Sequence, residues 1–297
     1  MYKTRTGDLT VGFREVGAIA ADIHSQAVWA KAAGFGSIDI VGARAAGIPA
    51  LLEAGLTVGS IDLPGWKNML SPDREQRLAA VAECKSFMVE CSEALRSGSP
   101  ANPLVFWTMM LPSDPSRTRK ENYGYMLESY RELNGLLADL DASIVIEGWP
   151  GPGCVVCTPE GYRSFLRDCQ CDRVGVNYDP SHLIRMGIDP LRFLKEFGPR
   201  TYHVHAKDTE ILSENLFEYG SEVPAIFEEP IAFGGHSWRY TIPGHGKMRW
   251  REAFRILNEC GYKGIVSIEL EDANFNLGNG TAEKEGLNLG GAFLSGC

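Results

Sequence analysis

One stretch, residues 173–208, constrains the fold of this chain more than any other. It contains two short apolar runs, and each run leads into side chains that bind metals or transfer protons. Side chains alternate faces along a strand. The first run therefore places Asn177 and Asp179 on one face, and the second places His203 and His205 on one face.

The two runs are residues 174–178 and 201–204. The segment between them has the signals of a helix. Asp189 and Pro190 suit the N-cap and the first helical position, and Gly198 suits the stop. A strand, a helix and a strand within about thirty residues form a right-handed crossover, which makes the two strands parallel. Both polar ends then lie at the carboxyl edge of a sheet, where α/β proteins place their sites.

The same alternation of strand and helix runs along the whole chain of 297 residues. Eight alternations fit a closed (β/α)₈ barrel, for which about 250 residues is typical. The predicted fold is therefore an α/β TIM barrel in a single domain, residues 1–297. Strands are expected at residues 9–13, 37–41, 56–63, 104–110, 143–147, 173–179, 201–205 and 264–270, and helices at 22–33, 45–54, 71–95, 119–140, 159–169, 190–197, 250–259 and 281–294.

Residues 208–249 break this rhythm. The span is rich in Gly, Pro, Glu and aromatic residues and has no sustained hydrophobic period. Loops of this length inside compact domains are usually functional. Because the span leaves its strand beside His205, we expect it to form a wall or lid of the pocket.

Composition limits the class of partner. The net charge is −9 and no basic run is present, which disfavours a nucleic-acid or anionic-membrane surface. No apolar run approaches the roughly eighteen residues of a membrane span, and the N-terminal residues lack the apolar core of a secretory signal. We expect a soluble cytoplasmic protein with a small-molecule partner.

The eight cysteines do not have the density of a disulfide scaffold. Cys154 and Cys157 together with Cys169 and Cys171 could be interpreted as a four-thiolate zinc site. The Cys-x-Cys spacing of the second pair is unlike the usual zinc knuckle. Reduced thiols are therefore expected.

The alternation of faces along the late strands predicts which side chains meet inside the barrel. In the strand at residues 143–147 the isoleucines face one way and Glu147 faces the other. The same test places Asp179, His205 and Glu269 on the inward faces of three later strands. A closed barrel brings these four faces to one rim.

Three carboxylates at one rim repel one another and lose hydration, so they need a cation. Oxygen donors with one imidazole suit Mn²⁺, Mg²⁺ or Co²⁺ better than a thiolate-preferring metal, although Zn²⁺ accepts the same ligands. Each residue alone has an ordinary alternative, as a helix cap, a surface ion pair or a core histidine. Four arriving at the same depth in the barrel favour one joint metal site.

Several segments carry a family resemblance between residues 143 and 272. IEGWPGPG, NYDPSHL, HVHAKD, RYTIPGHGKMRW and GYKGIVSIELED resemble the xylose isomerase-like sugar isomerase and epimerase barrels. The resemblance implies that Glu147, Asp179, His205 and Glu269 bind one divalent metal, with Mn²⁺ expected first. It also implies that Glu147 and Glu269 exchange protons with a bound sugar.

The resemblance extends to substrate contacts. It implies that His182 contacts the substrate, with helix capping or support of the metal site as the alternative, and that Arg239 does so, with a surface role as the alternative. For Lys207 a substrate contact and a salt bridge with Asp208 both fit, and the salt bridge is slightly preferred. His203, two residues deeper than His205, is expected in the core or behind the ligands.

Two positions depart from the family pattern. Gly148 stands where the family often has Asn, and Asp39 stands where it often has Glu. Both bear on the substrate pocket rather than on the metal. No glycine-rich phosphate cradle with an adjacent Lys or Arg is present, so an unphosphorylated sugar is expected.

The expected activity is isomerisation or epimerisation of a ketose or aldose through an enediolate. The alternative is a lyase or dehydratase that acts on a keto-sugar, an inosose or a 3-keto-glycoside at the same site. A trinuclear-zinc endonuclease would need more histidines in the first half, where His24 stands alone, and a basic surface. A carbohydrate-binding barrel without catalysis and a homo-oligomer are both compatible with the sequence.

Overall fold

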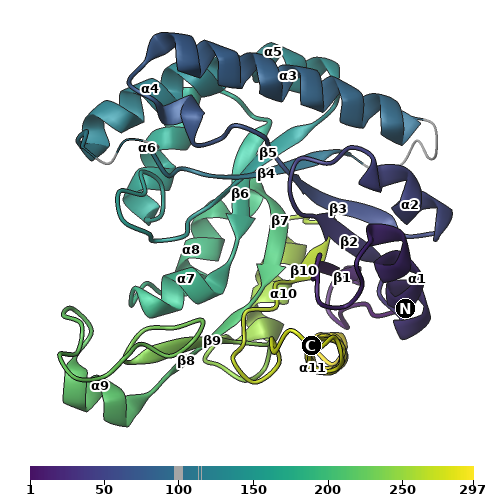
Figure 1. Ribbon diagram of the computed structural model, residues 1–297, viewed down its shortest axis with the longest axis vertical. Helices are drawn as coiled ribbons and strands as arrows, with labels where there is room; N and C mark the ends of the chain where they lie inside the picture. Colours follow the sequence, from purple (N-terminus) through teal and green to yellow (C-terminus); the bar gives the residue numbers. More distant parts are fainter. Residues whose placement is uncertain (97–102, 113, 115) are drawn as a thin grey trace. The chain divides into compact units, whose positions relative to one another are not determined.

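Eight parallel strands close into a barrel, which confirms the predicted (β/α)₈ fold. The structure is a computed structural model and describes residues 1–96, 103–112, 114 and 116–297 (Figure 1). The barrel strands are β1 (Val11–Arg14), β2 (Ser37–Ile40), β3 (Thr57–Asp62), β4 (Val105–Met109), β5 (Ser143–Glu147), β6 (Val174–Tyr178), β7 (Thr201–Ala206) and β10 (Val266–Ile268). Their order around the barrel is β1-β10-β7-β6-β5-β4-β3-β2.

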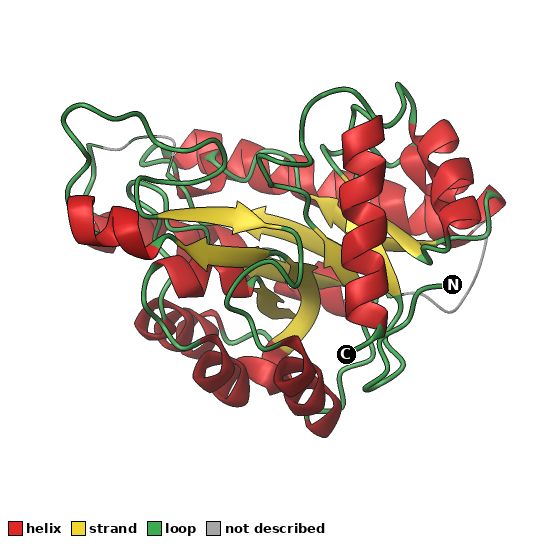
Figure 2. Cartoon of the chain, turned by 90° about the horizontal axis from the view of Figure 1, so that it is seen from below, coloured by secondary structure: helices red, strands yellow, loops and turns green. Residues whose placement is uncertain are grey.

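Helices, red in Figure 2, alternate along the chain with the strands, which are yellow. Helix α8 (Pro190–Phe197) begins at the expected cap, where the carboxylate of Asp189 accepts hydrogen bonds from Leu191 N and Arg192 N. No described helix is long and apolar enough to cross a membrane. The helices outside the insertion are α1 (Ile23–Ala33), α2 (Gly47–Glu53), η1 (Asn68–Leu70), α3 (Arg74–Arg96), α4 (Arg119–Arg131), α5 (Asn134–Asp139), α6 (Pro159–Cys169), α7 (Pro180–Arg185), α8 (Pro190–Phe197), η2 (Gly198–Arg200), α10 (Trp250–Glu259) and α11 (Thr281–Ser295).

The residue contacts divide the chain into two compact units. The first unit comprises residues 1–38, 179–198 and 204–297, and the second comprises residues 39–178 and 199–203. Two of the boundaries between these units fall inside strands, in β2 and in β7. The division therefore does not follow a linker in the sequence.

In the second unit, β4, β5 and β6 form the buried sheet. Phe106 lies opposite Ile144, and Ile144 lies opposite Val174; all three side chains are fully buried. The helices α3, α4 and α5 lie along one side of this sheet (Figure 1). Tyr130 of α4 and Phe165 of α6 pack edge to face, with ring centroids 5.8 Å apart.

The region predicted as one helix at residues 119–140 is two helices, α4 and α5. The backbone N–H of Leu133 bonds to Tyr130 O, three residues back, which interrupts the α-helical pattern. Both Leu133 and Leu137 are fully buried at this bend. Apolar side chains that continue through a bend leave no gap in the hydrophobic pattern, so the bend could not be predicted from that pattern.

In the first unit, β10 pairs with both β1 and β7, and the insertion follows β7. The insertion is more regular than predicted, because β8 (Asp208–Ile211) and β9 (Trp238–Thr241) form an antiparallel hairpin around α9 (Ser213–Tyr219). Thr209 lies opposite Tyr240 in this hairpin. Strands of four residues are too short to establish an alternating pattern in sequence.

Candidate metal centre

Three of the four predicted ligands meet in the first unit. Asp179 directly follows β6, His205 lies in β7, and Glu269 directly follows β10. The register places Ser267 opposite His205, so Glu269 extends two residues beyond it on the same face. One ligand atom from each of Asp179, His205 and Glu269 lies within 4.8 Å of the others.

Asp179 has a different role at each carboxylate oxygen. Oδ1 caps α7 by accepting hydrogen bonds from Ser181 N at 2.9 Å and from Ser181 Oγ at 2.6 Å. Pro180 takes the first helical position, where its missing N–H costs nothing. Oδ2 is buried and makes no hydrogen bond of good geometry. It lies 3.2 Å from both His182 Nε2 and Lys207 Nζ. The cap thus aims Oδ2 at the cluster.

Lys207 is a buried cation among the carboxylates. Only 1% of its side chain is exposed, and Nζ lies 3.2 Å from Asp179, 2.5 Å from Glu269 and 2.8 Å from Glu271. Burial by itself lowers the pKa of Lys207, but these three carboxylates raise it well above its ordinary value. The ammonium group therefore stays charged and offsets part of the negative charge.

The expected Lys207–Asp208 salt bridge is wrong. Lys207 lies between β7 and β8 and pairs instead with Asp179, Glu269 and Glu271. The carboxylate of Asp208 accepts hydrogen bonds from Thr209 N and Met248 N, both at 2.9 Å, and from Trp250 Nε1 at 3.2 Å. Burial raises the pKa of Asp208, and these donors counteract the rise.

Asp208 thereby ties the first residue of the insertion to its last residues. Gly244 N also donates to Asp208 Oδ2, at 3.3 Å. A Cβ at Gly246 would lie 2.2 Å from Asp208 Oδ1, so this close approach requires glycine. The base of the insertion is therefore fixed.

Tyr240 is a residue of the site that the sequence interpretation missed. Its hydroxyl lies 2.7 Å from His182 Nδ1, and its ring lies 4.5 Å from Lys207 Nζ. Burial raises the pKa of Tyr240, so the hydroxyl remains protonated. Arg239, the adjacent residue, points to the other face of β9 and pairs with Glu210 at 2.7 Å.

In the second unit, Glu147 ends β5 and is buried. The register places it opposite Asn177, whose Nδ2 donates to Glu147 Oε2 at 3.2 Å. The indole N–H of Trp107 donates to the same oxygen. Trp66 packs edge to face on Trp107, with centroids 6.5 Å apart. Two donors on one oxygen fix the orientation of this carboxylate.

His203 belongs to the core, as expected. Its Nε2 lies 2.9 Å from Asp39 Oδ2, and Asp39 Oδ1 accepts from Ser60 N at 2.9 Å. All eight cysteines are free thiols, and no group of three or more metal-binding side chains among the described residues includes a cysteine. The four-thiolate zinc site is therefore absent from the part of the chain that the structure describes.

The donor set fits a divalent cation with a preference for oxygen. Asp179 Oδ2 is a buried carboxylate oxygen that lacks a hydrogen bond, and His205 and Glu269 add an imidazole and a second carboxylate. Two oxygens and one nitrogen match the preferences of Mn²⁺, Mg²⁺ and Co²⁺. The buried acidic and histidine cluster can therefore hold a metal.

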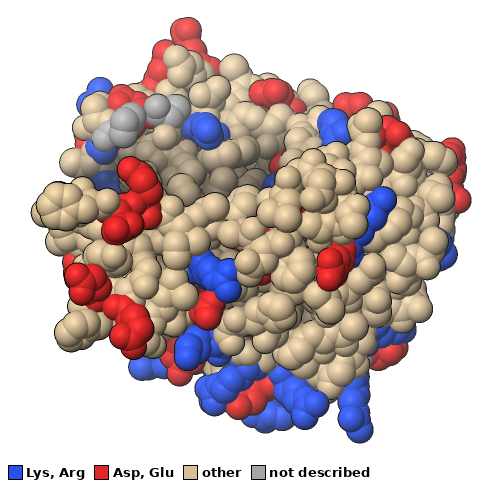
Figure 3. All heavy atoms as spheres, turned by 60° about the horizontal axis from the view of Figure 1, so that its bottom comes forward, with Lys and Arg blue, Asp and Glu red and all other residues tan. Residues whose placement is uncertain are grey.

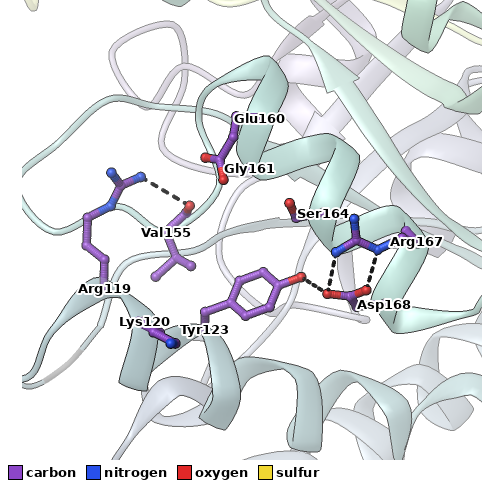
Figure 4. A pocket seen from close by; sticks show the side chains of 9 residues that line it. All are labelled: Arg119, Lys120, Tyr123, Val155, Glu160, Gly161, Ser164, Arg167 and Asp168. Atoms are coloured by element: carbon purple, nitrogen blue, oxygen red, sulfur yellow. Dashed lines mark hydrogen bonds and ion pairs between the residues drawn. The ribbon is translucent and has the colours of Figure 1, made fainter.

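A separate surface cavity of about 330 Å³ lies between α4, α6 and the loop at Val155 (Figure 4). Three of its polar side chains pair with one another: Tyr123 donates to Asp168 at 2.6 Å, and Arg167 pairs with Asp168 at 2.6 Å. None of the residues that line it ends a barrel strand. The cavity therefore does not contribute to the metal centre.

Comparison with known proteins agrees with this architecture. The chain is 38% identical over 111 residues to the uncharacterised protein YfiH of Bacillus subtilis strain 168, covering 36% of this chain and 34% of that protein. It is 29% identical over 156 residues to inosose dehydratase of Clostridium botulinum strain Eklund 17B, covering 51% of this chain and 48% of that protein. The chain thus spans a third to a half of the length of these curated relatives.

Solved structures match over nearly the full chain. D-psicose 3-epimerase with D-fructose superposes with a TM-score of 0.68 and 16% identity, covering 96% of this chain and 98% of that chain. At this identity the match establishes the fold. The family model of the xylose isomerase-like TIM barrel matches residues 28–290. The chain belongs to the family of xylose isomerase-like TIM barrels.

Proposed function

We propose that the protein is a divalent-metal-dependent isomerase or epimerase of an unphosphorylated sugar. The observation that carries this proposal is the buried cluster of Asp179, His205 and Glu269 at the carboxyl end of the barrel strands, with Lys207 beside it. In TIM barrels this end is where catalysis takes place.

Glu147 is proposed as the fourth ligand. It ends β5 at the level of Asn177 in β6, and Asp179 follows Asn177 by two residues along the chain. In a closed barrel, inward residues at this level face a common axis. The donors Trp107 and Asn177 hold one oxygen of Glu147, which supports a carboxylate kept in a defined orientation.

The chemistry begins at the carbon next to the sugar carbonyl. A bound metal would polarise that carbonyl and offset the negative charge that develops on its oxygen. In our proposal, either Glu147 or Glu269 removes the proton and the other carboxylate returns one, to the neighbouring carbon or to the opposite face. Lys207 orients Glu269 through its contact of 2.5 Å with Oε2.

The substrate hydroxyls are proposed to meet the polar groups around the cluster. His182, Tyr240 and Lys207 contact one another or share Asp179, and they form a connected polar group. Arg239 pairs with Glu210 on the other face of the hairpin. We therefore assign the substrate contact in the insertion to Tyr240 rather than to Arg239.

A second candidate is a dehydratase that acts on an inosose or a related keto-sugar. The 29% identity to inosose dehydratase over 156 residues favours it. Proton removal next to a carbonyl is common to both reactions, and the dehydratase then expels a hydroxyl group from the next carbon instead of regaining the proton. The same carboxylates could serve both activities.

Mn²⁺ is the metal proposed, and Mg²⁺, Co²⁺ and Zn²⁺ are the alternatives to test against it. We also propose that the protein works in the cytoplasm. Eight free thiols support a reducing compartment, because oxidising compartments favour disulfides.

The deciding experiment incubates metal-loaded protein in D₂O with ketoses, aldoses, inososes and 3-keto-glycosides, with NMR detection of products. Deuterium beside the carbonyl of an isomerised sugar supports the main proposal, and a dehydrated product supports the second. Neither outcome with any substrate, from protein that binds metal, contradicts both.

The roles of the two glutamates are tested by substitution. Glu147→Gln and Glu269→Gln keep an oxygen ligand but remove the base, so we expect each to lose about a hundredfold or more in turnover. Glu259→Gln, at an exposed ion pair on α10, is the matched control and should leave turnover unchanged. Wild-type turnover in either site variant would remove that residue from the mechanism.

A further inference from the structure

Arg14, the last residue of β1, is a cation to which the proposed function gives no role. In β1 the side chains of Val11 and Phe13 are fully buried, and Phe13 packs edge to face on Trp29 of α1, with ring centroids 5.7 Å apart. Side chains alternate along a strand, so Gly12 and Arg14 face the other way, toward the inside of the barrel. The strand β1 therefore ends in a positive charge on its inward face.

The strand register places Arg14 at the level of the metal centre. Gly12 lies opposite Ser267 of β10, and Ser267 lies opposite His205 of β7. Residues two apart along a strand share a face. The next inward row, two residues further along, consists of Arg14, Glu269 and Lys207. Three neighbouring strands thus end in a cation, a carboxylate and a cation, and all three residues belong to the first unit.

The two carboxylate oxygens of Glu269 contact different cations. Oε2 lies 2.5 Å from Lys207 Nζ and 3.4 Å from His205 Nδ1, so it is the oxygen inside the metal-binding cluster. Oε1 lies 3.4 Å from Arg14 Nε. The last side-chain bond of glutamate has no sharp rotational preference of its own, so contacts at both oxygens are needed to fix it. The contact with Arg14 therefore helps to decide which oxygen faces the cluster.

Burial distinguishes this ion pair from the pairs on the surface. Basic and acidic side chains lie next to each other at several places on the face shown in Figure 3, and exposed pairs of this kind contribute little. Arg255 and Glu259 form such a pair, with 58% of each side chain exposed. Only 13% of the Arg14 side chain and 14% of the Glu269 side chain are exposed. Water screens the buried pair less, so its attraction is stronger.

We propose that Arg14 is a positioning residue, which holds Glu269 in the orientation that the metal centre requires. This inference rests on the proposed function of that centre. Arg14 acts through the carboxylate of Glu269 and needs no contact with the substrate. The guanidinium group remains charged at any pH near neutrality, so it exerts this hold throughout the working range. Removing a residue that orients a metal ligand typically lowers metal affinity or activity by about 10- to 100-fold.

The first test measures metal affinity by calorimetry, with Mn²⁺ added to the metal-free full chain. Arg14→Met should raise the dissociation constant for Mn²⁺ at least about tenfold, because Oε1 of Glu269 loses its cation. Arg14→Lys keeps the charge and should recover part of the affinity. Arg255→Met is the matched control, because it also removes an Arg–Glu ion pair, and it should leave the constant unchanged.

The second test asks whether Arg14 acts through Glu269. In the Glu269→Gln chain the neutral amide no longer attracts the guanidinium, so adding Arg14→Met should change the Mn²⁺ dissociation constant by less than about twofold. Steady-state kinetics on the substrate found by the D₂O experiment supply another measurement. Arg14→Met should lower kcat and leave KM nearly unchanged, because the substrate itself loses no contact.

Several results would overturn the proposal. An unchanged Mn²⁺ dissociation constant in Arg14→Met excludes the positioning role, and so does an equal loss in the wild-type and Glu269→Gln chains. A raised KM with unchanged metal affinity would make Arg14 a substrate contact instead. If circular dichroism shows that Arg14→Met does not fold, Arg14→Gln takes its place, and unchanged affinity in that variant excludes the role.

Metal binding is measured without substrate, so the two proposals fail in different ways. A wild-type chain that binds Mn²⁺ while Arg14→Met binds it equally well contradicts the role of Arg14 alone. A wild-type chain that binds none of Mn²⁺, Mg²⁺, Co²⁺ and Zn²⁺ contradicts the metal centre itself, and the role of Arg14 with it.

Discussion

The insertion after β7 contains two regions that follow opposite rules. At its base, Asp208 and Tyr240 are buried polar side chains, and each contacts several partners within the same unit. In the segment between its two strands, residues 213–237, here called the arm, Phe217 and Phe227 are apolar side chains that remain exposed. The base obeys the requirement that buried polar groups are paired, whereas the arm leaves its apolar surface in water.

The two regions of the insertion therefore have different roles. The base places a hydroxyl and a carboxylate at fixed positions, so a change there should alter stability or chemistry. The arm leaves its large apolar side chains in water, so a change to one of them should alter the stability of the chain little. The following predictions test that separation, from the largest expected effect to the smallest.

Lys207→Met should have the largest effect, because it leaves Asp179, Glu269 and Glu271 without their common cation. Breaking a buried ion pair on one side costs roughly 3 to 5 kcal/mol. We expect that loss in the free energy of unfolding measured with a chelator present, and a partial recovery when Mn²⁺ is added. Lys247→Met, an exposed lysine of the same segment, is the control. Equal stability of the two variants would contradict the role assigned to Lys207.

Asp208→Ala should destabilise the chain by about 3 kcal/mol, because buried donors lose a charged acceptor. The N–H groups of Thr209, Gly244 and Met248 then lack their partner. Urea unfolding measures the lost free energy of unfolding. Limited proteolysis should show faster cleavage within the insertion, because its base is no longer held. Glu210→Ala, on the half-exposed face of β8, serves as the comparison and should lose less than about 1 kcal/mol.

Tyr240→Phe should act on chemistry more than on stability. The ring that packs against Lys207 remains, but the hydroxyl at His182 is lost. One such hydrogen bond corresponds to about a tenfold change in kcat/KM. Steady-state kinetics on the substrate found by the D₂O experiment would measure it. An unchanged kcat/KM would remove Tyr240 from the site.

Arg239→Ala should have the smallest effect, since Arg239 pairs with Glu210 on the other face of the hairpin. Exposed ion pairs contribute about 0 to 1 kcal/mol. We expect kcat/KM within about twofold of wild type, which corresponds to the lower part of that energy range. A loss comparable with that of Tyr240→Phe would restore Arg239 as a substrate contact.

The fold and the candidate ligands could be predicted from the sequence because both depend on short patterns. Alternation along each strand was enough to choose Asp179, His205 and Glu269, and their ligand atoms lie together in the structure. Strand and helix order predicted the barrel, since eight regular units leave few other arrangements.

Contacts across long separations could not be predicted in the same way. Lys207 bonds to Glu269 and Glu271, which lie more than sixty residues away, so its adjacent residue Asp208 was the wrong partner. Trp107 meets Glu147 across forty residues, and Tyr240 meets His182 across fifty-eight. Helix α7 was different, because Asp179-Pro180 is a recognisable N-cap signal that the interpretation did not use.

Asp179 also limits how this site can be redesigned. One oxygen begins α7 and the other faces the cluster, so the length of the aspartate side chain is matched to two distances at once. A longer glutamate could still reach a cation but would lose the helix start, and an asparagine could still cap the helix but would bring no charge. Attempts to change metal preference at this residue will therefore also change the backbone beside it. The neighbouring Glu269, which caps no described helix, is the more separable place to begin.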